Sequence, residues 1–172
     1  VEELLAGMDF SVFAVTDGKS AVILPEAKDY KRIGEGDQGP NTGGMGAVSP
    51  VPLFDEAMQK QVMSRIIEPT IEGLAKDGLP YKGFLFFGLI DVEGEAMVIE
   101  YNCRMGDPET EVVMARLDED FLPILRDAGN GKLTNRVARQ SKQSAATVMM
   151  VSEGYPGSYP KGLPILGLDQ AS

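Results

Sequence analysis

Apolar residues follow strand-like spacing in two parts of the chain. Residues 11–15 and 20–24 are short apolar runs on either side of a turn that contains Asp17-Gly18, and Asp-Gly between two such runs is typical of a β-hairpin. Residues 83–92 and 96–102 form a second pair of β-rich runs with a short glycine-containing link between them. The pattern therefore predicts two hairpins.

Helix-like spacing lies between these hairpins. From residue 55 to residue 76 one apolar stripe repeats at every fourth position, through Phe54, Met58, Val62, Ile66, Thr70 and Leu74. This stripe predicts one helix that bends at Pro69 and ends at Gly78.

A second helix is expected after residue 107. Asp107 is the predicted N-cap, Pro108 the first-turn proline and Glu109 an acidic residue beside the helix N-terminus. We expect the helix to end near residues 129–131, with the acidic run 118–120 on its solvated face. The side chains predicted to face inward are Val112, Val113, Leu117, Phe121 and Leu125.

Two segments lack such periodicity. Residues 25–52 are rich in glycine, proline and charge, and a connection of that length tends to be functional or disordered; we expect it to be mobile when empty. Residues 145–151 are typical of a strand of another unit, and a Gly/Pro-rich passage follows. The prediction is an α+β fold with residues 1–140 in one domain and residues 141–172 opening a small β-rich domain. Because the chain opens on Val1 and stops just after that passage, we expect it to be an internal piece of a longer protein.

Composition narrows the possible chemistry. The 172 residues are 43% apolar, which is enough for a sizeable core, and the formal net charge of −10 argues against nucleic acid as a partner. The chain has no histidine, so the usual zinc sites and the Ser-His and Cys-His pairs are excluded. No membrane span or leader is recognisable, and the single cysteine, Cys103, fits a cytoplasmic location.

The long glycine-rich segment contains a dinucleotide-like pattern that we reject. Residues 34–39 satisfy G-x-G-x-x-G, but Pro40 and further loop residues follow where a helix would have to begin. Glycine backbone together with Lys31 and Arg32 is instead suited to binding an anion. The alternative is a flexible surface loop with incidental charges.

A second group of candidate residues lies at the end of the last β-run. Strand alternation places Glu100 and Asn102 on the same face and Tyr101 on the other, so that a carboxylate and an amide oxygen point to one spot, as a magnesium site requires. A solvated strand end is the alternative. Arg104 and Asp107 follow directly, where a structural turn is the alternative to a functional role.

Three motifs together resemble the phosphoribosylamine-glycine ligases, a family of ATP-grasp enzymes. They are VEELLAGMD at residues 1–9, PNTGGMG at 40–46 and EYNCRMGDPET at 100–110. The resemblance extends over essentially the whole chain. It implies an antiparallel ATP-grasp sheet with packed helices. It also implies an activity of purine synthesis, in which glycine is joined to 5-phosphoribosylamine through glycyl phosphate at the expense of ATP.

The resemblance also implies roles for individual residues. Glu100 and Asn102 would hold Mg²⁺, or Mn²⁺ in its place, against the ATP phosphates, and Arg104 and Asp107 would be catalytic, beside the reacting phosphate and glycine. Glu2, Glu3 and Asp9 would contact adenine and ribose. The phosphoribosylamine site would comprise Lys31, Arg32, Asn41, Thr42, Gly43, Gly44, Met45 and Gly46.

Four positions depart from the commoner family pattern: Asp9, Tyr30, Met105 and Glu111. Tyr30 replaces a loop histidine, so no argument here rests on histidine chemistry. One alternative is another ATP-grasp ligase of purine metabolism, which would lack the PNTGGMG loop. The other is that the isolated chain is a non-catalytic module that binds nucleotide and metal.

Overall fold

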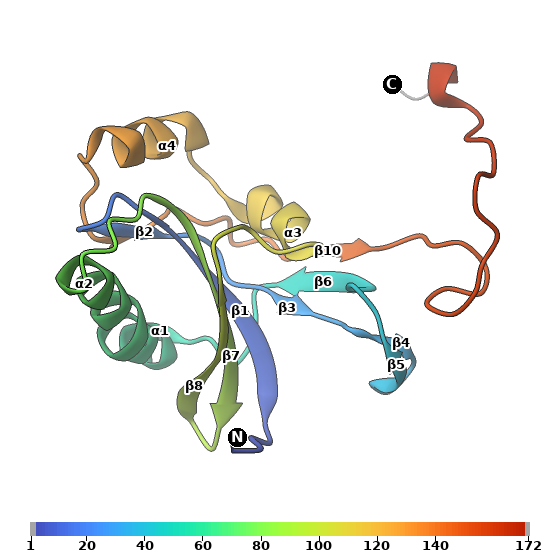
Figure 1. Cartoon of the computed structure of the whole chain (residues 1–172), viewed down its shortest axis with the longest axis horizontal. Helices are drawn as coiled ribbons and strands as arrows, with labels where there is room; N and C mark the ends of the chain where they lie inside the picture. The colour runs from blue at the N-terminus through green and yellow to red at the C-terminus, as the bar shows by residue number, and fades with distance from the viewer. Residues whose placement is uncertain (1–2, 171–172) are drawn as a thin grey trace.

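The computed structural model describes residues 3–170 and has a five-stranded sheet at its centre (Figure 1). The strand order is β8-β7-β1-β2-β9, and every neighbouring pair is antiparallel except β2 with β9. Both predicted hairpins are confirmed, as β1 with β2 and as β7 with β8. The strands are β1 (Met8–Thr16), β2 (Ala21–Ile23), β7 (Gly83–Val92), β8 (Glu95–Asn102) and β9 (Arg136–Val137).

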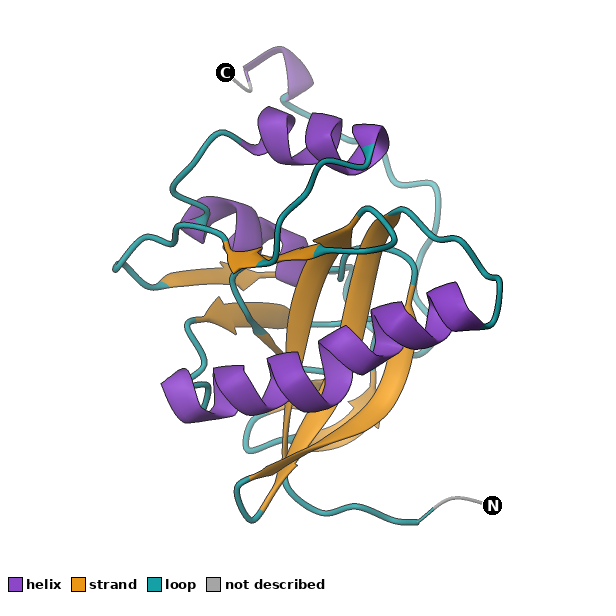
Figure 2. Ribbon diagram, turned by 90° about the vertical axis from the view of Figure 1, so that its left-hand side faces the viewer, coloured by secondary structure: helices purple, strands orange, loops and turns teal. Residues whose placement is uncertain are grey.

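A long helical rod covers one face of this sheet (Figure 2). It consists of α1 (Glu56–Val62), a π-helical turn (Met63–Ile67) and α2 (Glu68–Lys76), and the Asp55 carboxylate caps it by accepting from the Met58 amide at 2.9 Å. The π turn ends two residues before Pro69, a residue with no N–H for a regular helical bond, and the bend at Pro69 stays a prediction. The apolar stripe of the rod packs against Phe10, Val12 and Phe87 of the sheet.

The opposite face is covered by two helices, α3 (Glu109–Arg116) and α4 (Phe121–Asn130). The prediction of one continuous helix is therefore wrong. Leu117 leaves the helical conformation, with φ −69° and ψ 116°, and forms a β-bridge with Gln140. Residues 118–120 connect the helices and are not a helix face, because the Asp120 carboxylate caps α4 at the Leu122 amide, 3.0 Å away.

The predicted N-cap role of Asp107 is also wrong. Pro108 is the N-cap of α3, and no side chain caps this helix. The Gly106 carbonyl accepts from the Thr110 amide at 3.2 Å and also from the Thr110 hydroxyl. These bonds close the first turn of the helix, so the exposed carboxylate of Asp107 stays available for another role.

The segment at residues 25–52 is more regular than predicted. It contains β3 (Lys28–Asp29) and β6 (Gly46–Ser49), which form a second sheet with β10 (Ala145–Val148), and a hairpin of β4 (Arg32–Gly34) with β5 (Gln38–Asn41). The glycine pattern at 34–39 forms the turn of that hairpin, where Gly36 and Asp37 have φ of 68° and 58°. No helix follows, which confirms the rejection of a dinucleotide loop.

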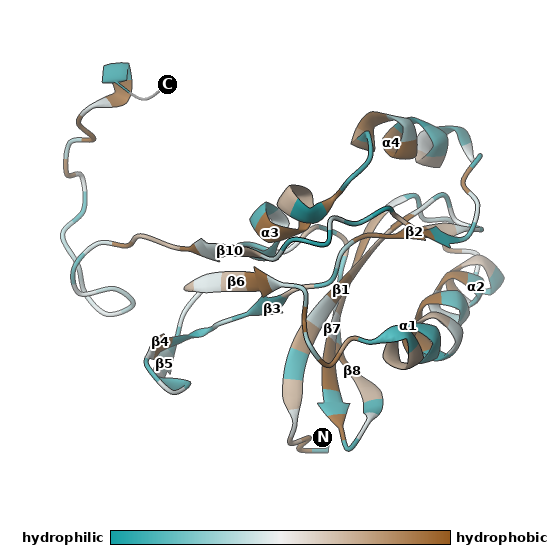
Figure 3. Cartoon of the chain, turned by 180° about the vertical axis from the view of Figure 1, so that it is seen from behind, coloured by the Kyte–Doolittle hydropathy of each residue, from teal (hydrophilic) through white to brown (hydrophobic). Residues whose placement is uncertain are grey.

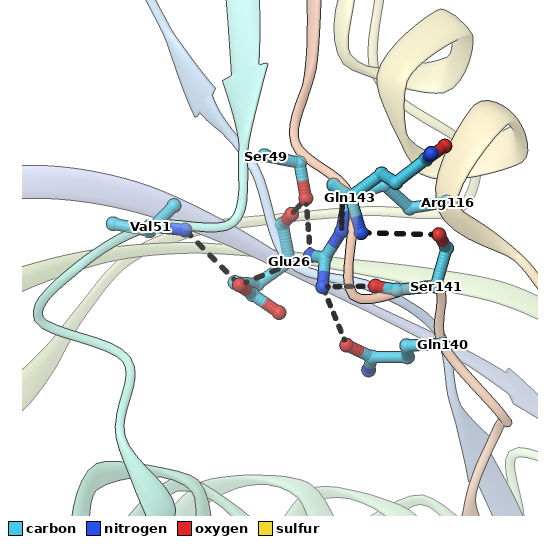
Figure 4. Close-up of polar contacts among 7 residues, drawn as sticks. All are labelled: Glu26, Ser49, Val51, Arg116, Gln140, Ser141 and Gln143. Carbon is cyan, nitrogen blue, oxygen red and sulfur yellow. Dashed lines mark hydrogen bonds and ion pairs between the residues drawn. The ribbon is translucent and has the colours of Figure 1, made fainter.

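A buried ion pair joins α3 to the second sheet (Figure 4). The Arg116 guanidinium lies 3.5 Å from the Glu26 carboxylate, and the two side chains are only 8% and 5% exposed. Arg116 also donates to the Ser49 hydroxyl at 2.8 Å and to the Ser141 carbonyl at 3.1 Å. The network therefore binds three segments that are distant in the sequence.

Beyond β10 the chain extends away from the rest of the molecule, with apolar positions along it (Figure 3). β10 confirms a strand within residues 145–151 and pairs with β6. The domain boundary near residue 141 stays a prediction. Within residues 3–170, no helix combines the length and the apolar character needed to cross a membrane.

Candidate active site

A β-bulge decides which way Glu100 points. Leu89 of β7 pairs with Val98 and Gly88 pairs with Glu100, which leaves Ile99 as the extra residue. Such a bulge reverses the alternation of side chains along a strand. Val98 faces the helical rod, so Glu100 would face it too in a regular strand; after the bulge it faces the opposite side.

Glu100 and Asn102 lie side by side on that face. The Asn102 amide nitrogen is 3.3 Å from a Glu100 carboxylate oxygen. Tyr101 points the other way, toward the rod, where its hydroxyl lies 3.3 Å from that of Thr70. The predicted common face is therefore confirmed. Gly88 leaves room for the carboxylate, because a Cβ there would lie 2.9 Å from the Glu100 Cγ.

Glu100 and Asn102 are of residue types that bind a hard divalent cation, and they would supply only some of its ligands. One carboxylate and one amide oxygen are suitable ligands, and Mg²⁺ is commonly held by one or two carboxylates together with substrate phosphates. Across residues 3–170 no group of three or more Cys, Asp or Glu side chains has the arrangement of a metal site. Most of the coordination would therefore have to come from a ligand such as a nucleotide phosphate and from water.

Two adjoining cavities lie on this side of the sheet, and Glu100 lines the smaller of them. The larger, of about 640 Å³, lies under the β4-β5 hairpin and is lined by Arg32 and Asn41 among others; the smaller, of about 100 Å³, is lined by Ser11 and Glu100. Three residues line both of them: Asp9, Asp29 and Lys31. The hairpin and the end of β8, which are about 60 residues apart in the sequence, thus line two adjoining cavities.

Asp9 forms an ion pair with Lys28, a residue that was not predicted from the sequence. The Lys28 ammonium lies 2.7 Å from the Asp9 carboxylate and 3.2 Å from the Asp9 carbonyl. The pair stands at the wall of the larger cavity. Asp9 therefore enters the site with its charge already matched by a cation.

Asp29 is the most strongly perturbed carboxyl of the site. It is only 7% exposed, and its Oδ1 atom has no hydrogen-bond partner among the described residues. Burial and then the nearby Glu109 carboxylate raise the pKa of Asp29 to about 6, although Lys31 opposes the shift. Glu109 is itself buried and accepts from the Ser11 hydroxyl at 3.1 Å.

The raised pKa leads to a prediction about stability. The pKa of Asp29 is 3.8 in the unfolded chain and about 6 in the folded protein, so the folded protein binds the proton more tightly between these pH values. The free energy of unfolding therefore falls as the pH rises through this window. Asp29→Asn removes the charge, and we expect it to raise the free energy of unfolding at pH 7.5 by up to about 3 kcal/mol. Urea denaturation at pH 7.5 and pH 3.5 checks this. An equal change at both pH values would contradict it.

The PNTGGMG loop lies against the start of α3. The amide and hydroxyl of Thr42 both donate to the Lys31 carbonyl, at 2.7 and 2.8 Å, which ties the loop to the hairpin. Gly44 has φ 121°, and a Cβ there would lie 2.4 Å from the Pro108 ring and 3.0 Å from Asp29 Oδ1. Glycine is therefore required at residue 44 for the loop to approach α3 so closely.

The other loop residues divide between the site and the sheet. Asn41 lines the larger cavity, and the Gly43 amide donates to the Tyr155 hydroxyl at 3.1 Å. The Met45 amide donates to the Tyr30 carbonyl, whereas Gly46 is buried in β6 with no room for a side chain beside Thr147. Met45 and Gly46 therefore shape the backbone of the loop.

The two basic residues of the hairpin differ in their contacts. Lys31 lines both cavities. Arg32 lines the larger cavity, and its guanidinium donates to the Gly39 carbonyl at 2.7 Å across the hairpin. The predicted anion-binding pair thus faces the site, with part of the Arg32 donor capacity used within the hairpin.

The predicted residues Glu3, Arg104 and Asp107 line neither of these two cavities. Arg104 is exposed and donates to the Met105 carbonyl at 2.8 Å, and Asp107 is exposed with its carbonyl beside Gly44. Glu3 lines a separate cavity of about 500 Å³ with Leu4 and Ile99. Glu2 lies outside the described residues, so its predicted nucleotide contact stays a prediction.

Five residues around the site were not predicted from the sequence: Ser11, Lys28, Asp29, Glu109 and Tyr155. A signal existed for two of them, because a lone serine in the apolar run 11–15 and an acid two positions before a pair of cations are both unusual. Glu109 was interpreted only as an acid at a helix start. Tyr155 lies more than 100 residues from Gly43, so no local pattern connects the two.

Comparison with known proteins shows the family of the chain. The family model described as phosphoribosylglycinamide synthetase, ATP-grasp (A) domain, matches residues 1–110. The phosphoribosylamine-glycine ligase of Agrobacterium fabrum is 49% identical over all of this chain, which covers 41% of that protein. The chloroplastic ligase of Arabidopsis thaliana is 47% identical over 99% of the chain and 32% of its own length.

A solved structure has the same fold. The phosphoribosylamine-glycine ligase of Thermotoga maritima superposes with a TM-score of 0.84 at 38% identity, over 94% of this chain and 40% of that one. An N5-carboxyaminoimidazole ribonucleotide synthetase from Thermus thermophilus, at 17% identity and a TM-score of 0.56 over 85% of this chain and 36% of its own, shares the fold alone. The chain thus spans about 40% of the length of its bacterial ligase relatives.

Proposed function

Because the chain belongs to the phosphoribosylglycinamide synthetase family, in its ATP-grasp (A) domain, we propose that the whole protein is an ATP-dependent ligase. It joins glycine to 5-phosphoribosylamine and releases ADP and phosphate, a step of purine synthesis. The observation that carries the proposal is a pair of adjoining cavities, hereafter the cleft, one lined by the cationic hairpin and the other by Glu100, with Asp9, Asp29 and Lys31 lining both.

In this proposal the nucleotide end of the cleft is formed by β8 and the start of the chain. Glu100 and Asn102 would hold Mg²⁺, or Mn²⁺, at the nucleotide phosphates, while Glu2, Glu3 and Asp9 would contact adenine and ribose. The bound ion supplies neutralisation of phosphate charge. The bulge at Ile99 supports this assignment, because it points the Glu100 carboxylate into the cleft and away from the helical rod.

The other end of the cleft receives phosphoribosylamine. Lys31 and Arg32 bind its phosphate, and the backbone of Asn41, Thr42, Gly43 and Gly44 closes over it, with Met45 and Gly46 holding the loop in place. Support comes from the larger cavity, which brings both cations and Asn41 to one wall. Charge-assisted bonds from lysine and arginine are suited to a phosphate monoester.

The first chemical step needs cations more than it needs a base. The carboxylate of glycine is ionised at neutral pH and attacks the terminal phosphate of ATP directly, giving glycyl phosphate. Arg104 and Asp107 lie beside this point, with Arg104 offsetting the charge of the transferred group. A chain without histidine can carry out such a step.

The proposal includes a cytoplasmic location and no nucleic-acid partner, in line with the free Cys103 and the acidic net charge.

The metal assignment is tested by two neighbouring substitutions. Glu100→Gln removes the only charged protein ligand of the proposed site, and we expect the apparent affinity for Mg²⁺-ATP to fall by about 10- to 100-fold. Tyr101→Phe is the matched control on the other face, because its hydroxyl contacts only Thr70 among described residues. Magnesium titrations of glycine-dependent ADP formation by the full-length protein measure both. Equal losses would remove Glu100 from the metal site.

The competing possibility is that this chain alone binds nucleotide and metal without catalysis. It is compatible with the same site, since the chain covers only part of its relatives. Glycine- and phosphoribosylamine-dependent ADP formation, measured for the full-length protein and for the isolated chain, distinguishes the two. Ligation by neither would contradict the proposed activity.

A further inference from the structure

The proposed roles leave Asp29 unused, although it stands at the junction of the two cavities. Its Oδ1 atom is buried and has no donor among the described residues, and its side chain is more than nine-tenths buried. Buried carboxylate oxygens in folded proteins nearly always accept a hydrogen bond, because leaving one unpaired is costly. The position therefore indicates a donor that a ligand brings.

The surroundings of Asp29 show what kind of donor fits. Glu109 faces it from α3 and Asp9 from β1, while Glu100 of β8 lines the smaller cavity with it. Of the two nearby cations, Lys28 is engaged by Asp9, so Lys31 is the one that offsets the acids. This excess of carboxylates favours a positively charged or strongly polarised N–H group.

One side of Asp29 is closed to any larger group. Gly44 packs so tightly that even a methyl group there would approach Oδ1 to 3.0 Å. Access remains from the cavities, one of which holds the cations Lys31 and Arg32 and the other Glu100. A ligand that binds its phosphate at the cations and extends toward Glu100 therefore brings its reacting end beside Asp29.

Building on the proposed function, we propose that Asp29 binds the primary amine of the acceptor substrate, the nitrogen that forms the new bond. In the second step this nitrogen attacks the acyl carbon of glycyl phosphate. The C–N bond forms, the bond from that carbon to the phosphate oxygen breaks, phosphate leaves, and the proton lost by nitrogen passes to the Asp29 carboxylate. Glu109, held by Ser11, keeps the electrostatic environment of Asp29 favourable to an amine.

Two nucleophiles distinguish this role from others. In the full-length protein, Asp29→Asn should lower kcat/KM for phosphoribosylamine by about 10- to 100-fold, the effect of losing one charge-assisted hydrogen bond. Hydroxylamine is a small α-nucleophile that attacks acyl phosphates readily in water, so it needs neither a positioned amine contact nor a protein group to take its proton. Glycine- and ATP-dependent formation of glycyl hydroxamate from hydroxylamine should therefore stay within about 2-fold of the unchanged protein.

Asp77→Asn is the matched control, because it makes the same chemical change at an exposed residue after α2. It should leave both reactions unchanged. Equal losses with both nucleophiles in Asp29→Asn would place Asp29 in the first step or in folding and overturn the inference, as would an unaltered kcat/KM for phosphoribosylamine. If the unchanged protein ligates neither amine, the proposed function itself fails.

Discussion

Replacing both Lys31 and Arg32 with methionine should raise the KM for phosphoribosylamine by at least about 100-fold in the full-length protein. Each charge-assisted hydrogen bond to a phosphate contributes roughly 1.5 to 3 kcal/mol, and every 1.4 kcal/mol corresponds to about tenfold in affinity. The affinity for Mg²⁺-ATP should change by less than about 3-fold, because the nucleotide is proposed to bind at the Glu100 end of the cleft. Initial-rate kinetics with each substrate varied in turn measure both values.

The single variants separate binding from folding of the hairpin. Arg32 bonds to Gly39 across the β4-β5 hairpin, so Arg32→Met removes an internal contact as well as a charge. The side chain of Lys31 has no such bond among the described residues and lines both cavities. Lys31→Met alone should therefore raise the KM for phosphoribosylamine by about 10-fold or more with the hairpin intact.

A double variant on the opposite side of the sheet is the control. Lys60→Met with Arg65→Met removes the same charges from the helical rod, where Arg65 pairs with the exposed Glu95. It should leave both KM values unchanged. A similar loss for both substrates in the Lys31/Arg32 variant would assign the hairpin to nucleotide binding or to folding, and an unchanged KM for phosphoribosylamine would remove the two residues from the site.

Arg116→Met should lower the free energy of unfolding by about 3 to 5 kcal/mol. Removing one partner of a buried ion pair leaves the other charge buried without compensation, and this costs far more than the pair contributes. Here the remaining charge is Glu26, whose side chain is 5% exposed and accepts one further bond, from the Val51 amide at 3.0 Å. Ser49 and Ser141 lose hydrogen-bond partners as well (Figure 4).

Urea denaturation of the variants measures the effect. Arg126→Met is the matched control, because Arg126 is exposed on α4 and its contact with the neighbouring Asp127 is a surface pair; we expect a change below about 0.5 kcal/mol. Adding Glu26→Gln to Arg116→Met removes the stranded charge and should restore part of the stability. A double variant less stable than Arg116→Met would contradict the ion-pair explanation.

Local patterns in the sequence were sufficient for several elements. The two hairpins and the rod at residues 55–76 were correct because apolar spacing and turn residues act over a few positions. The common face of Glu100 and Asn102 was also correct, since the two residues are adjacent positions on one side of a strand. The motifs additionally identified the family, which comparison with known proteins agrees with.

What the sequence alone determined is thus local spacing and family; the tertiary structure decided how these elements meet. Residues 109–130 have a helical pattern throughout, yet Leu117 leaves the helix for a bridge with Gln140, a partner more than 20 positions away. The bulge at Ile99 depends on pairing with β7, and without it Glu100 would face the rod. Asp29 becomes a site residue only because β1, α3 and the glycine loop enclose it. Each of these outcomes depends on contacts between segments that are distant in the sequence. The free energy of such contacts cannot be inferred from a local pattern of residues.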